Sequence, residues 1–235
     1  MNLKNLPLIV VAAGAILSTP LALAAESTIV PYGVLDAGYL YLDGAAPAGA
    51  TAAQPYHGFQ SGYNGVSILG ADGSEDLGGG SKAFFKLETW VNMGSGQVGA
   101  PSKFWSRFSQ VGLANDKLGS VAFGQCLCIS QHTYKYDPFY LGGIGGATMS
   151  LYRNGRAFSN VVSLSSPAYA GANLHFYFAP SERGPEGRFM AVLANYDHGP
   201  LSATISHDSI RDGNGRLSSL YYGETSALGV RYQLD

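Results

Sequence analysis

Residues 82 to 93 alternate between polar and apolar side chains, and this alternation is the feature that most limits how the chain folds. One parity reads Lys82, Phe84, Lys86, Glu88, Trp90 and Asn92, and the other reads Ala83, Phe85, Leu87, Thr89, Val91 and Met93. Because successive side chains of a β-strand point to opposite faces, one face of this strand is apolar and the other carries charge. The apolar face meets either the core of a soluble sandwich or lipid.

The first 24 residues have the three parts of a secretory signal peptide. Lys4 supplies the positive start, an apolar run follows, and Ala22-Leu23-Ala24 forms a small-residue cleavage site. We therefore predict a signal peptide over 1–24 and a mature domain over 25–235. Beyond this segment the sequence has no apolar run of the roughly 20 residues that a membrane-spanning helix needs.

The mature part reads as a series of strands joined by alternately short and long connections. The chain is 46% hydrophobic and only 13% charged, and it holds 32 glycines, whereas soluble domains are roughly 25% charged. We predict ten strands, approximately at 27–42, 62–74, 80–93, 103–115, 118–126, 156–167, 171–180, 187–197, 200–209 and 222–235. Short turns on one side and longer loops on the other are typical of an antiparallel transmembrane β-barrel, which is the predicted fold.

Several strands keep one apolar and one polar face. In 171–180 the apolar face holds Leu174, Phe176 and Phe178, and the strand near the end of the chain places Leu228, Val230 and Tyr232 together. Such polar faces suit a water-filled lumen, and the apolar faces suit lipid. The stretch "FMAVLANY" is apolar on both parities, so its register is not fixed by the pattern.

Four stretches resemble the general diffusion porins of the Gram-negative outer membrane, of the beta-proteobacterial type. These are "STIVPYGVLDAGYLY", "GSEDLGGGSKAFFKLE", "FWSRFSQVGLANDKLGSVAFGQ" and "RAFSNVVSLSSPAYAG". The resemblance implies a homotrimer of barrels with about 16 strands each, embedded in outer-membrane lipid, through which ions and small hydrophilic solutes diffuse. It also implies that the long segment 127–155 folds into the lumen as a constriction loop.

The resemblance and the strand parity together predict which residues line the pore. They are Asp36, Lys82, Lys86, Glu88, Arg107, Asp137 and Arg156. The sequence departs from the family where basic residues are usual, because Ile68, Asp72 and Gln125 stand there. Arg107 and Arg156 are thus expected to supply most of the remaining positive charge at the constriction, and replacing Arg107 by Ser is expected to favour cations. With fewer cations the sequence argues against anion selectivity and is compatible with a weak cation preference.

Ten strands are fewer than the family's barrel has. The sequence leaves three explanations open: a fragment, a truncated gene or a shorter barrel closed by ten strands. An open sheet edge in lipid leaves backbone groups unpaired, so we expect this chain on its own to insert poorly and conduct weakly.

Little in the sequence supports an enzyme, a metal site or binding to nucleic acid. The five histidines are scattered, neither a G-x-S-x-G nor an H-E-x-x-H motif is present, and the formal net charge is −2. We expect no cofactor and no metal. Cys126 and Cys128 are read as two small residues on one strand face, because a bond between them would need an awkward geometry. The alternatives to a channel are a non-conducting or adhesive outer-membrane barrel, a barrel enzyme, and a secreted β-sandwich binding protein.

Overall fold

The computed structural model describes residues 27–45, 54–62, 65–100, 103–137, 157–180, 187–212, 214, 216–217 and 223–234. Within them lie twelve strands, one short helix and one 3-10 turn. The strands are β1 (Ser27–Val34), β2 (Ala37–Ala45), β3 (Gln54–Ser61), β4 (Ile68–Gly78), β5 (Ser81–Trp90), β6 (Phe108–Asn115), β7 (Gly119–Cys126), β8 (Phe158–Ser165), β9 (Ala172–Ala179), β10 (Phe189–His198), β11 (Leu201–Ile210) and β12 (Glu224–Tyr232). Helix α1 covers Ser130–Thr133, and the turn η1 covers Tyr134–Tyr136.

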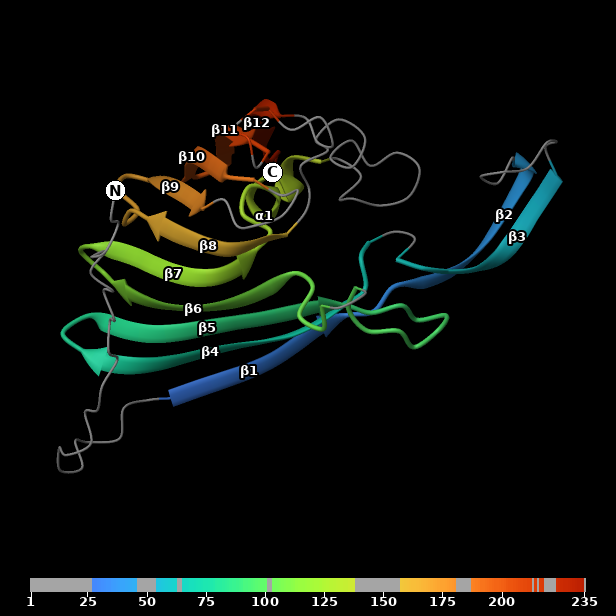
Figure 1. Ribbon diagram of the computed structural model, residues 1–235, viewed down its shortest axis with the longest axis horizontal. Coiled ribbons are helices and arrows are strands. Elements are labelled where there is room, and N and C mark those ends of the chain that lie inside the picture. Colours follow the sequence, from blue (N-terminus) through green and yellow to red (C-terminus); the bar gives the residue numbers. More distant parts are fainter. Residues whose placement is uncertain are drawn as a thin grey trace, which may run out of the picture.

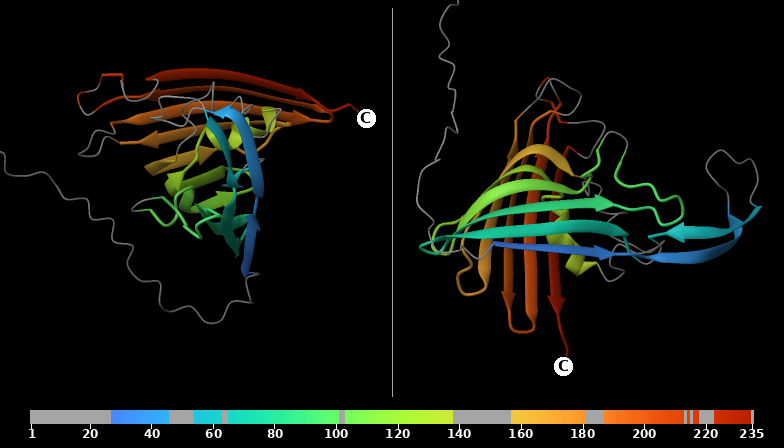
Figure 2. Two further views of the ribbon diagram at one scale, coloured as in Figure 1. Left: turned by 90° about the vertical axis from the view of Figure 1, so that its right-hand side faces the viewer. Right: turned by 90° about the horizontal axis from the view of Figure 1, so that it is seen from below.

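Ten of the strands form a single antiparallel sheet in the order β1-β4-β5-β6-β7-β8-β9-β10-β11-β12. Apart from β1, which pairs with β4, each strand pairs with its neighbour in the chain, as in a meander. The sheet curves strongly into a trough, and α1 lies inside it (Figures 1 and 2). The all-β antiparallel prediction is confirmed, and so is the number of strands in the wall.

The first predicted strand is wrong in extent, because the chain leaves the main sheet after Val34. β2 and β3 pair with each other as a separate hairpin that projects away from the trough (Figure 1), so the predicted connection 43–61 contains a strand. Hydrogen bonds at Asp36 hold the break: its backbone N–H donates to Ser67 Oγ at 2.9 Å, and its Oδ2 accepts from the Gly65 N–H at 2.9 Å. These contacts join segments 29 to 31 residues apart in sequence, which a local alternation pattern does not register.

The short turns gather at one end of the trough. Between β4 and β5 the backbone turns at Gly78, Gly79 and Gly80, whose φ angles are 80°, 63° and 74°. L-residues with a Cβ avoid this left-handed region, so the three glycines account for the tight turn that the sequence predicts here. The described residues of the connection between β5 and β6, 91–100 and 103–107, lie at the opposite end (Figure 1).

The two faces of the sheet differ as the alternation predicts. The outer face carries large apolar side chains, including Val111 at 61% and Leu228 at 75% exposure, with Phe123, Leu174 and Ile205 between them. The positions next to these in each strand point to the inner face, where most side chains are polar and less exposed to solvent. No helix among the described residues is long and apolar enough to cross a membrane.

The best-packed part of the interior lies under the start of the segment that follows β7. Phe158 and Phe189 stack with ring centroids 3.8 Å apart, and Leu127, Ile129 and Leu193 are buried with them. In β10 the inward residues are Phe189, Ala191 and Leu193, whereas Met190 and Val192 face outward. One apolar parity of "FMAVLANY" therefore contacts the chain inside the trough and the other forms part of the outer face.

The interpretation of the two cysteines as unlinked residues of one strand is wrong. Cys126 and Cys128 form a disulfide, and both are fully buried. β7 ends at Cys126, and the backbone turns at Cys128, where φ is +31°. Because the strand does not continue through Cys128, the same-face geometry assumed for the pair does not apply.

Candidate functional site

The inner wall of the trough encloses an open hollow of about 620 Å³. Its lining comes from seven strands and from α1, and it consists mainly of small polar, basic and aromatic side chains: Thr28, Val30, Asp72, Ser74, Lys82, Phe84, Lys86, Gln110, Ser120, Gln131, His132, Ser163, Ser165, His175 and Tyr177 among others. Strand register explains the set, since Asp72, Lys86 and Gln110 are aligned across β4, β5 and β6. We call this space the inner hollow.

Two lysines of β5, Lys82 and Lys86, which the strand parity predicts to line a pore, reach the inner hollow. Lys86 Nζ lies 4.0 Å from Asp72 Oδ1 on the adjacent strand. It also lies 4.8 Å from the ring centroid of Phe108 and 5.6 Å from that of Tyr32. Lys82 is exposed and lies nearer the short-turn end of the same strand. A solvated cation thus stands beside an anion in the middle of this wall.

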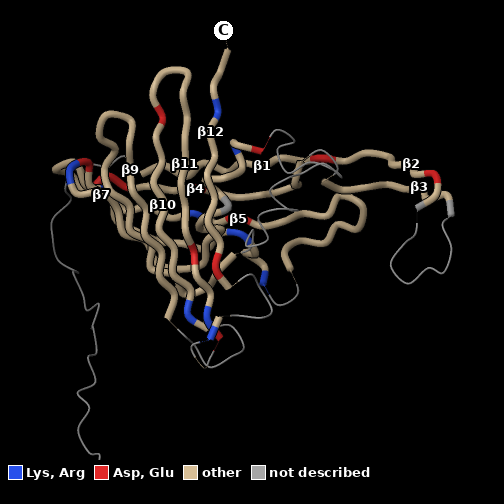
Figure 3. Tube along the Cα trace, turned by 90° about the horizontal axis from the view of Figure 1, so that it is seen from above, with Lys and Arg blue, Asp and Glu red and all other residues tan. Residues whose placement is uncertain are grey.

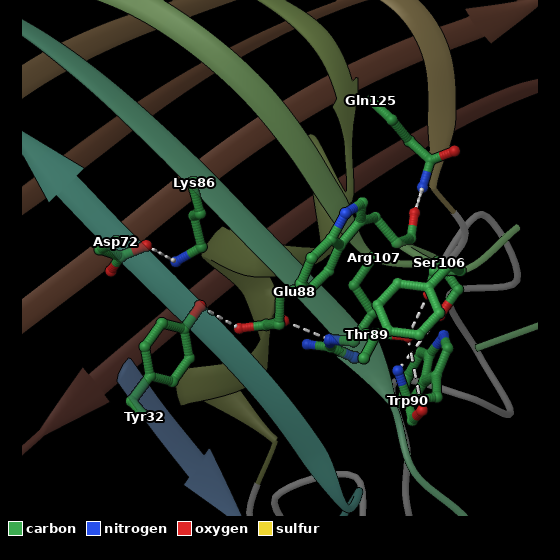
Figure 4. Close-up of polar contacts among 11 residues, drawn as sticks. Tyr32, Asp72, Lys86, Glu88, Thr89, Trp90, Ser106, Arg107 and Gln125 are labelled. Atoms are coloured by element: carbon green, nitrogen blue, oxygen red, sulfur yellow. Dashed lines mark hydrogen bonds and ion pairs between the residues drawn. The ribbon is translucent and has the colours of Figure 1, made fainter. Parts of the chain in front are cut away.

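Glu88 and Arg107 form a buried ion pair at the end of the wall nearest the long connections (Figure 4). Glu88 Oε1 accepts a hydrogen bond from Arg107 Nε, and Glu88 Oε2 accepts one from the Tyr32 hydroxyl at 2.7 Å. The Arg107 guanidinium also stacks on Trp90, with Cζ 4.1 Å from the ring centroid. Glu88 is 4% and Arg107 5% exposed. Carboxylate, guanidinium and aromatic ring form one packed unit.

Residues 104–107 form a strap that hydrogen bonds hold against the wall. The Thr89 hydroxyl donates to the Phe104 carbonyl, and Ser106 Oγ accepts from the Trp90 N–H at 3.1 Å. Gln125 Nε2 donates to the Trp105 carbonyl at 2.8 Å (Figure 4). Gln125, which stands where the resemblance places a basic residue, therefore fixes the strap and adds no charge to the wall.

The start of the predicted constriction loop is fastened to the inner wall by a polar cluster that we call the loop anchor: His132, His175, Tyr177 and Asn195. His132 Nε2 lies 2.7 Å from the Tyr177 hydroxyl, and His132 Nδ1 lies 3.1 Å from Asn195 Nδ2. The His132 and His175 ring centroids are 4.3 Å apart. Burial, with smaller effects of His175 and Lys135, lowers the pKa of His132 to about 3. His132 is thus neutral at physiological pH.

Two further contacts extend the fastening towards β12. Lys135 Nζ lies 2.5 Å from Asp197 Oδ1 of β10. Tyr136 packs over Gly229 of β12, where an added Cβ would lie 2.6 Å from Tyr136 Cγ. Residues 127–137 therefore fold into the trough, and 138–155, the rest of the predicted loop, lie outside the described residues.

The predicted pore-lining residues separate into several places. Lys82 and Lys86 line the inner hollow. Glu88 and Arg107 are brought together but are buried, and Asp137 is buried just after η1. Asp36 lies at the break between β1 and β2, where it accepts backbone hydrogen bonds. Arg156 lies outside the described residues.

The sequence patterns did not predict that Tyr32 contacts Glu88, and they did not predict the loop anchor. A signal for half of the anchor is present, because strand alternation places His175 and Tyr177 on the polar face of 171–180. His132 and Asn195 are 63 residues apart and meet only because 127–137 fold inward. Among the described residues no group of three or more His, Cys, Asp or Glu side chains is placed to hold a metal ion.

Several known proteins are similar to this chain in sequence. The family model of the Gram-negative porins matches residues 10–235. The chain is 27% identical to an outer membrane porin protein of Bordetella pertussis over 91% of its length, and 32% identical to the outer membrane porin protein 32 of Delftia acidovorans over 87%. It covers 61% and 60% of those two proteins, so it spans about three fifths of the curated relatives.

Solved structures show the same fold. An anion-selective porin from Comamonas acidovorans superposes with a TM-score of 0.69 at 30% identity, covering 80% of this chain and 58% of that one. OmpF of Salmonella typhi, solved with daunomycin, superposes with a TM-score of 0.61 at 14% identity, over 88% of this chain and 62% of that one. The second likeness concerns the fold alone.

Proposed function

The chain belongs to the Gram-negative porin family of the outer membrane, and on that basis we propose that its trough forms the wall of a water-filled channel. Ions and small hydrophilic solutes would cross it by passive diffusion. Conduction requires that the edges of β1 and β12 be paired, with each other or with further strands, because unpaired backbone groups in lipid cost several kcal/mol each, in order of magnitude. We also propose the homotrimer and the cleaved signal peptide that the family resemblance implies.

The observation that carries this proposal is the contrast between the two faces of one sheet. The outer face presents a band of apolar side chains that continues from β6 to β12, whereas the inner face of β1 and β4 to β9 lines the inner hollow with many hydroxyl, amide and charged groups. A β-sandwich buries such an apolar face against a second sheet. Here every one of the ten wall strands belongs to one curved sheet.

We further propose that the channel discriminates only weakly between anions and cations. Two of the three basic residues that β5 and the strap place on the inner wall are matched by acids: Lys86 by Asp72, and Arg107 by Glu88. The third, Lys82, lines the hollow near the short-turn end. Paired charges of opposite sign produce a small net field in the lumen. The anion-selective relative supports a channel function, and the local pairing supports a weaker preference in this chain.

Cysteine accessibility tests the assignment of the two faces. The native cysteines form a disulfide and leave the described part of the chain without a free thiol, so single introduced thiols give a clean signal. Gln110→Cys faces the inner hollow, and its neighbour Val111→Cys faces outward. In outer membranes a charged, water-soluble maleimide is expected to label position 110 and spare position 111. Equal labelling of both would contradict the lumen.

Planar-bilayer recording tests conduction itself. Folded protein in which the edges of β1 and β12 are paired, identified by a shift of gel mobility on heating, is expected to give stepwise, ohmic conductance with a reversal potential near zero in a salt gradient. Folded and inserted protein that produces no steps would overturn the channel proposal and favour a structural barrel. Measuring insertion separately from current distinguishes this result from failed assembly.

A further inference from the structure

A second hollow, of about 290 Å³, lies at the end of the trough opposite the short turns. Two segments enclose it: residues 61–67, which connect β3 to β4, and residues 90–99, which begin at the end of β5. Figure 1 shows this region where the hairpin β2–β3 projects from the wall. The hollow shares no lining residue with the inner hollow. We call it the rim hollow.

Hydrogen bonds between the two segments fix the walls of the rim hollow. The Val91 N–H donates to the Ser67 carbonyl at 3.0 Å, and the Met93 N–H donates to Ser61 Oγ at 2.8 Å. Because these bonds lie within the chain itself, the shape of the hollow is set before a solute arrives. A site formed in advance loses less free energy to the ordering of its own groups when a ligand binds.

The rim hollow is uncharged. Neither segment contains Lys, Arg, Asp or Glu, so their described residues are tan in Figure 3, whereas β4 and β5 carry coloured positions. An ion that entered the hollow would lose part of its hydration without meeting an opposite charge on these walls. The charge of the lining therefore favours a neutral solute.

Two side-chain amides supply the hydrogen-bonding groups of the rim hollow. Asn92 Oδ1 accepts from the N–H groups of Gly94 and Ser95 at 2.9 and 3.0 Å. Asn92 Nδ2 and the side-chain amide of Gln97 make no hydrogen bond to the residues that the structure describes. An amide offers donors and an acceptor, and a hydroxyl group is both at once. These amides thus suit a solute that carries several hydroxyl groups.

Trp90 adds an aromatic surface to the rim hollow. The Arg107 guanidinium covers one face of the ring, with Cζ 4.1 Å from the ring centroid (Figure 4). Arg107 does not line the rim hollow, so the ring meets the hollow with its remaining surface. A pyranose ring presents a face of C–H bonds, which packs on the apolar, electron-rich surface of an aromatic ring. An acyclic polyol has no such face.

We propose that the rim hollow binds one pyranose unit of a neutral saccharide, with the sugar ring against Trp90 and its hydroxyl groups hydrogen-bonded to Asn92 and Gln97. The volume of about 290 Å³ is close to the lower limit of small-molecule pockets, about 300 Å³, and therefore suits a single sugar unit. A role of this site in transport rests on the proposed channel. Binding itself does not require conduction and is measured separately.

The test follows the fluorescence of Trp90 in the full chain, folded in micelles of an amine-oxide detergent that has no sugar headgroup. The chain contains two tryptophans, Trp90 and Trp105. Trp105→Phe keeps an aromatic ring beside Phe104 and leaves Trp90 as the reporter. Titration with methyl α-glucoside is expected to change the Trp90 emission in a saturable way. Sorbitol, which has the hydroxyl groups without the pyranose ring, is expected to bind about fivefold more weakly.

Two amide variants in this background test the hydrogen bonds. Gln97→Ala removes one amide, and Asn92→Asp removes the Nδ2 donors while keeping the oxygen that accepts from Gly94 and Ser95. Each is expected to weaken binding of methyl α-glucoside about fivefold. Gln233→Ala is the matched control, because it removes an exposed amide beside the turn between β10 and β11, at the opposite end of the sheet. Its expected affinity equals that of the background protein.

A heat-dependent shift of gel mobility shows that each variant is folded before binding is compared. Equal binding of sorbitol, unchanged binding in both amide variants, or tighter binding of glucuronate or glucosamine than of methyl α-glucoside would each overturn the saccharide site. A protein that conducts without binding the glucoside refutes this site and leaves the channel proposal intact. A protein that binds the glucoside without conducting supports the site and refutes the channel.

Discussion

The two halves of the wall use the same strand geometry for different purposes. From β4 to β7 the inner face is open to the hollow, and charged groups such as Lys82, Lys86 and Asp72 stand on it. From β8 to β12 residues 127–137 cover much of the inner face, and Phe158, Phe189 and Leu193 are buried there. Ser163 and Ser165 of β8 still border the hollow. A cluster of fully buried inward apolar residues in this chain therefore marks the place where another segment covers the wall.

The comparison also separates two kinds of charge within the open half. Lys86 and Asp72 are partly solvated, with side chains 34% and 52% exposed. Glu88 and Arg107, which lie nearer the long connections, are buried and packed against Trp90. In the proposed channel the first pair would act on passing ions, whereas the second pair holds the strap at 104–107 in place.

The largest effect is expected from breaking the buried pair. Glu88→Gln leaves the Arg107 guanidinium buried beside a neutral amide, and removing one partner of a buried pair costs about 4 kcal/mol of unfolding free energy. Asp72→Asn removes the equivalent acid from the exposed pair and should cost less than about 1 kcal/mol. Urea unfolding in micelles, followed by tryptophan fluorescence, gives both values. Similar values for the two variants would remove the distinction between them.

The next largest effect is expected from a change in the apolar packing of the covered half of the wall. Phe189→Ala deletes a ring that stacks on Phe158 and is 1% exposed, and such cavities cost about 3 kcal/mol or more. Phe84→Ala is the control on the open half, where the ring lies over Gly112 and borders the hollow, and we expect about 1 kcal/mol. The same unfolding assay applies, and a larger loss for Phe84→Ala would contradict the assignment of the packed half.

Acid should loosen the covered half through His132. Its pKa is about 3 in the folded protein, against about 6.5 in an unfolded chain. The unfolded chain therefore binds a proton that the folded one does not, and stability that is complete above pH 6.5 is lost as the pH falls towards 3. We expect a loss of about 2 kcal/mol by pH 5.

Comparing unfolding at pH 8 and pH 5 in His132→Gln isolates this contribution from the titration of carboxylates. His132→Gln can keep a hydrogen bond to Tyr177, and its stability should depend less on pH than that of the original chain. His57→Gln, on the exposed hairpin β2–β3, serves as the control and should retain the full dependence. An identical pH dependence in all three proteins would show that His132 is accessible to protons when folded.

The smallest expected effect concerns selectivity. Asp72→Asn leaves Lys86 without its nearby anion, so the reversal potential in a salt gradient should move by a few millivolts towards anions, as expected from one added charge in the lumen. Lys86→Ser should move it the other way. Arg107→Ser, which the sequence alone favours as the decisive change, is expected to act on stability more than on selectivity. A larger shift of the reversal potential for Arg107→Ser than for Lys86→Ser would support the sequence-based expectation that Arg107 supplies charge at the constriction.

Local patterns in the sequence predict the strands and their two faces well. The parity of 82–93 places Lys82 and Lys86 on the inner wall, and the glycines at 78–80 mark the turn that the structure has. Both features depend only on residues close in sequence, because a strand alternates every residue and a turn is set by backbone angles. The family resemblance, carried by short motifs, is confirmed by the family match over 10–235.

What only the tertiary structure decided are the contacts between segments far apart in the chain. Tyr32 meets Glu88 across 56 residues, and His132 meets Asn195 across 63. The disulfide between Cys126 and Cys128 is short in sequence, yet it depends on where β7 ends and the chain turns inward. The sequence determined that polar and apolar faces exist, because alternation is local. Which polar groups are paired, buried or left in water depends on what folds against them, and that is fixed only when distant strands and the inward segment pack together.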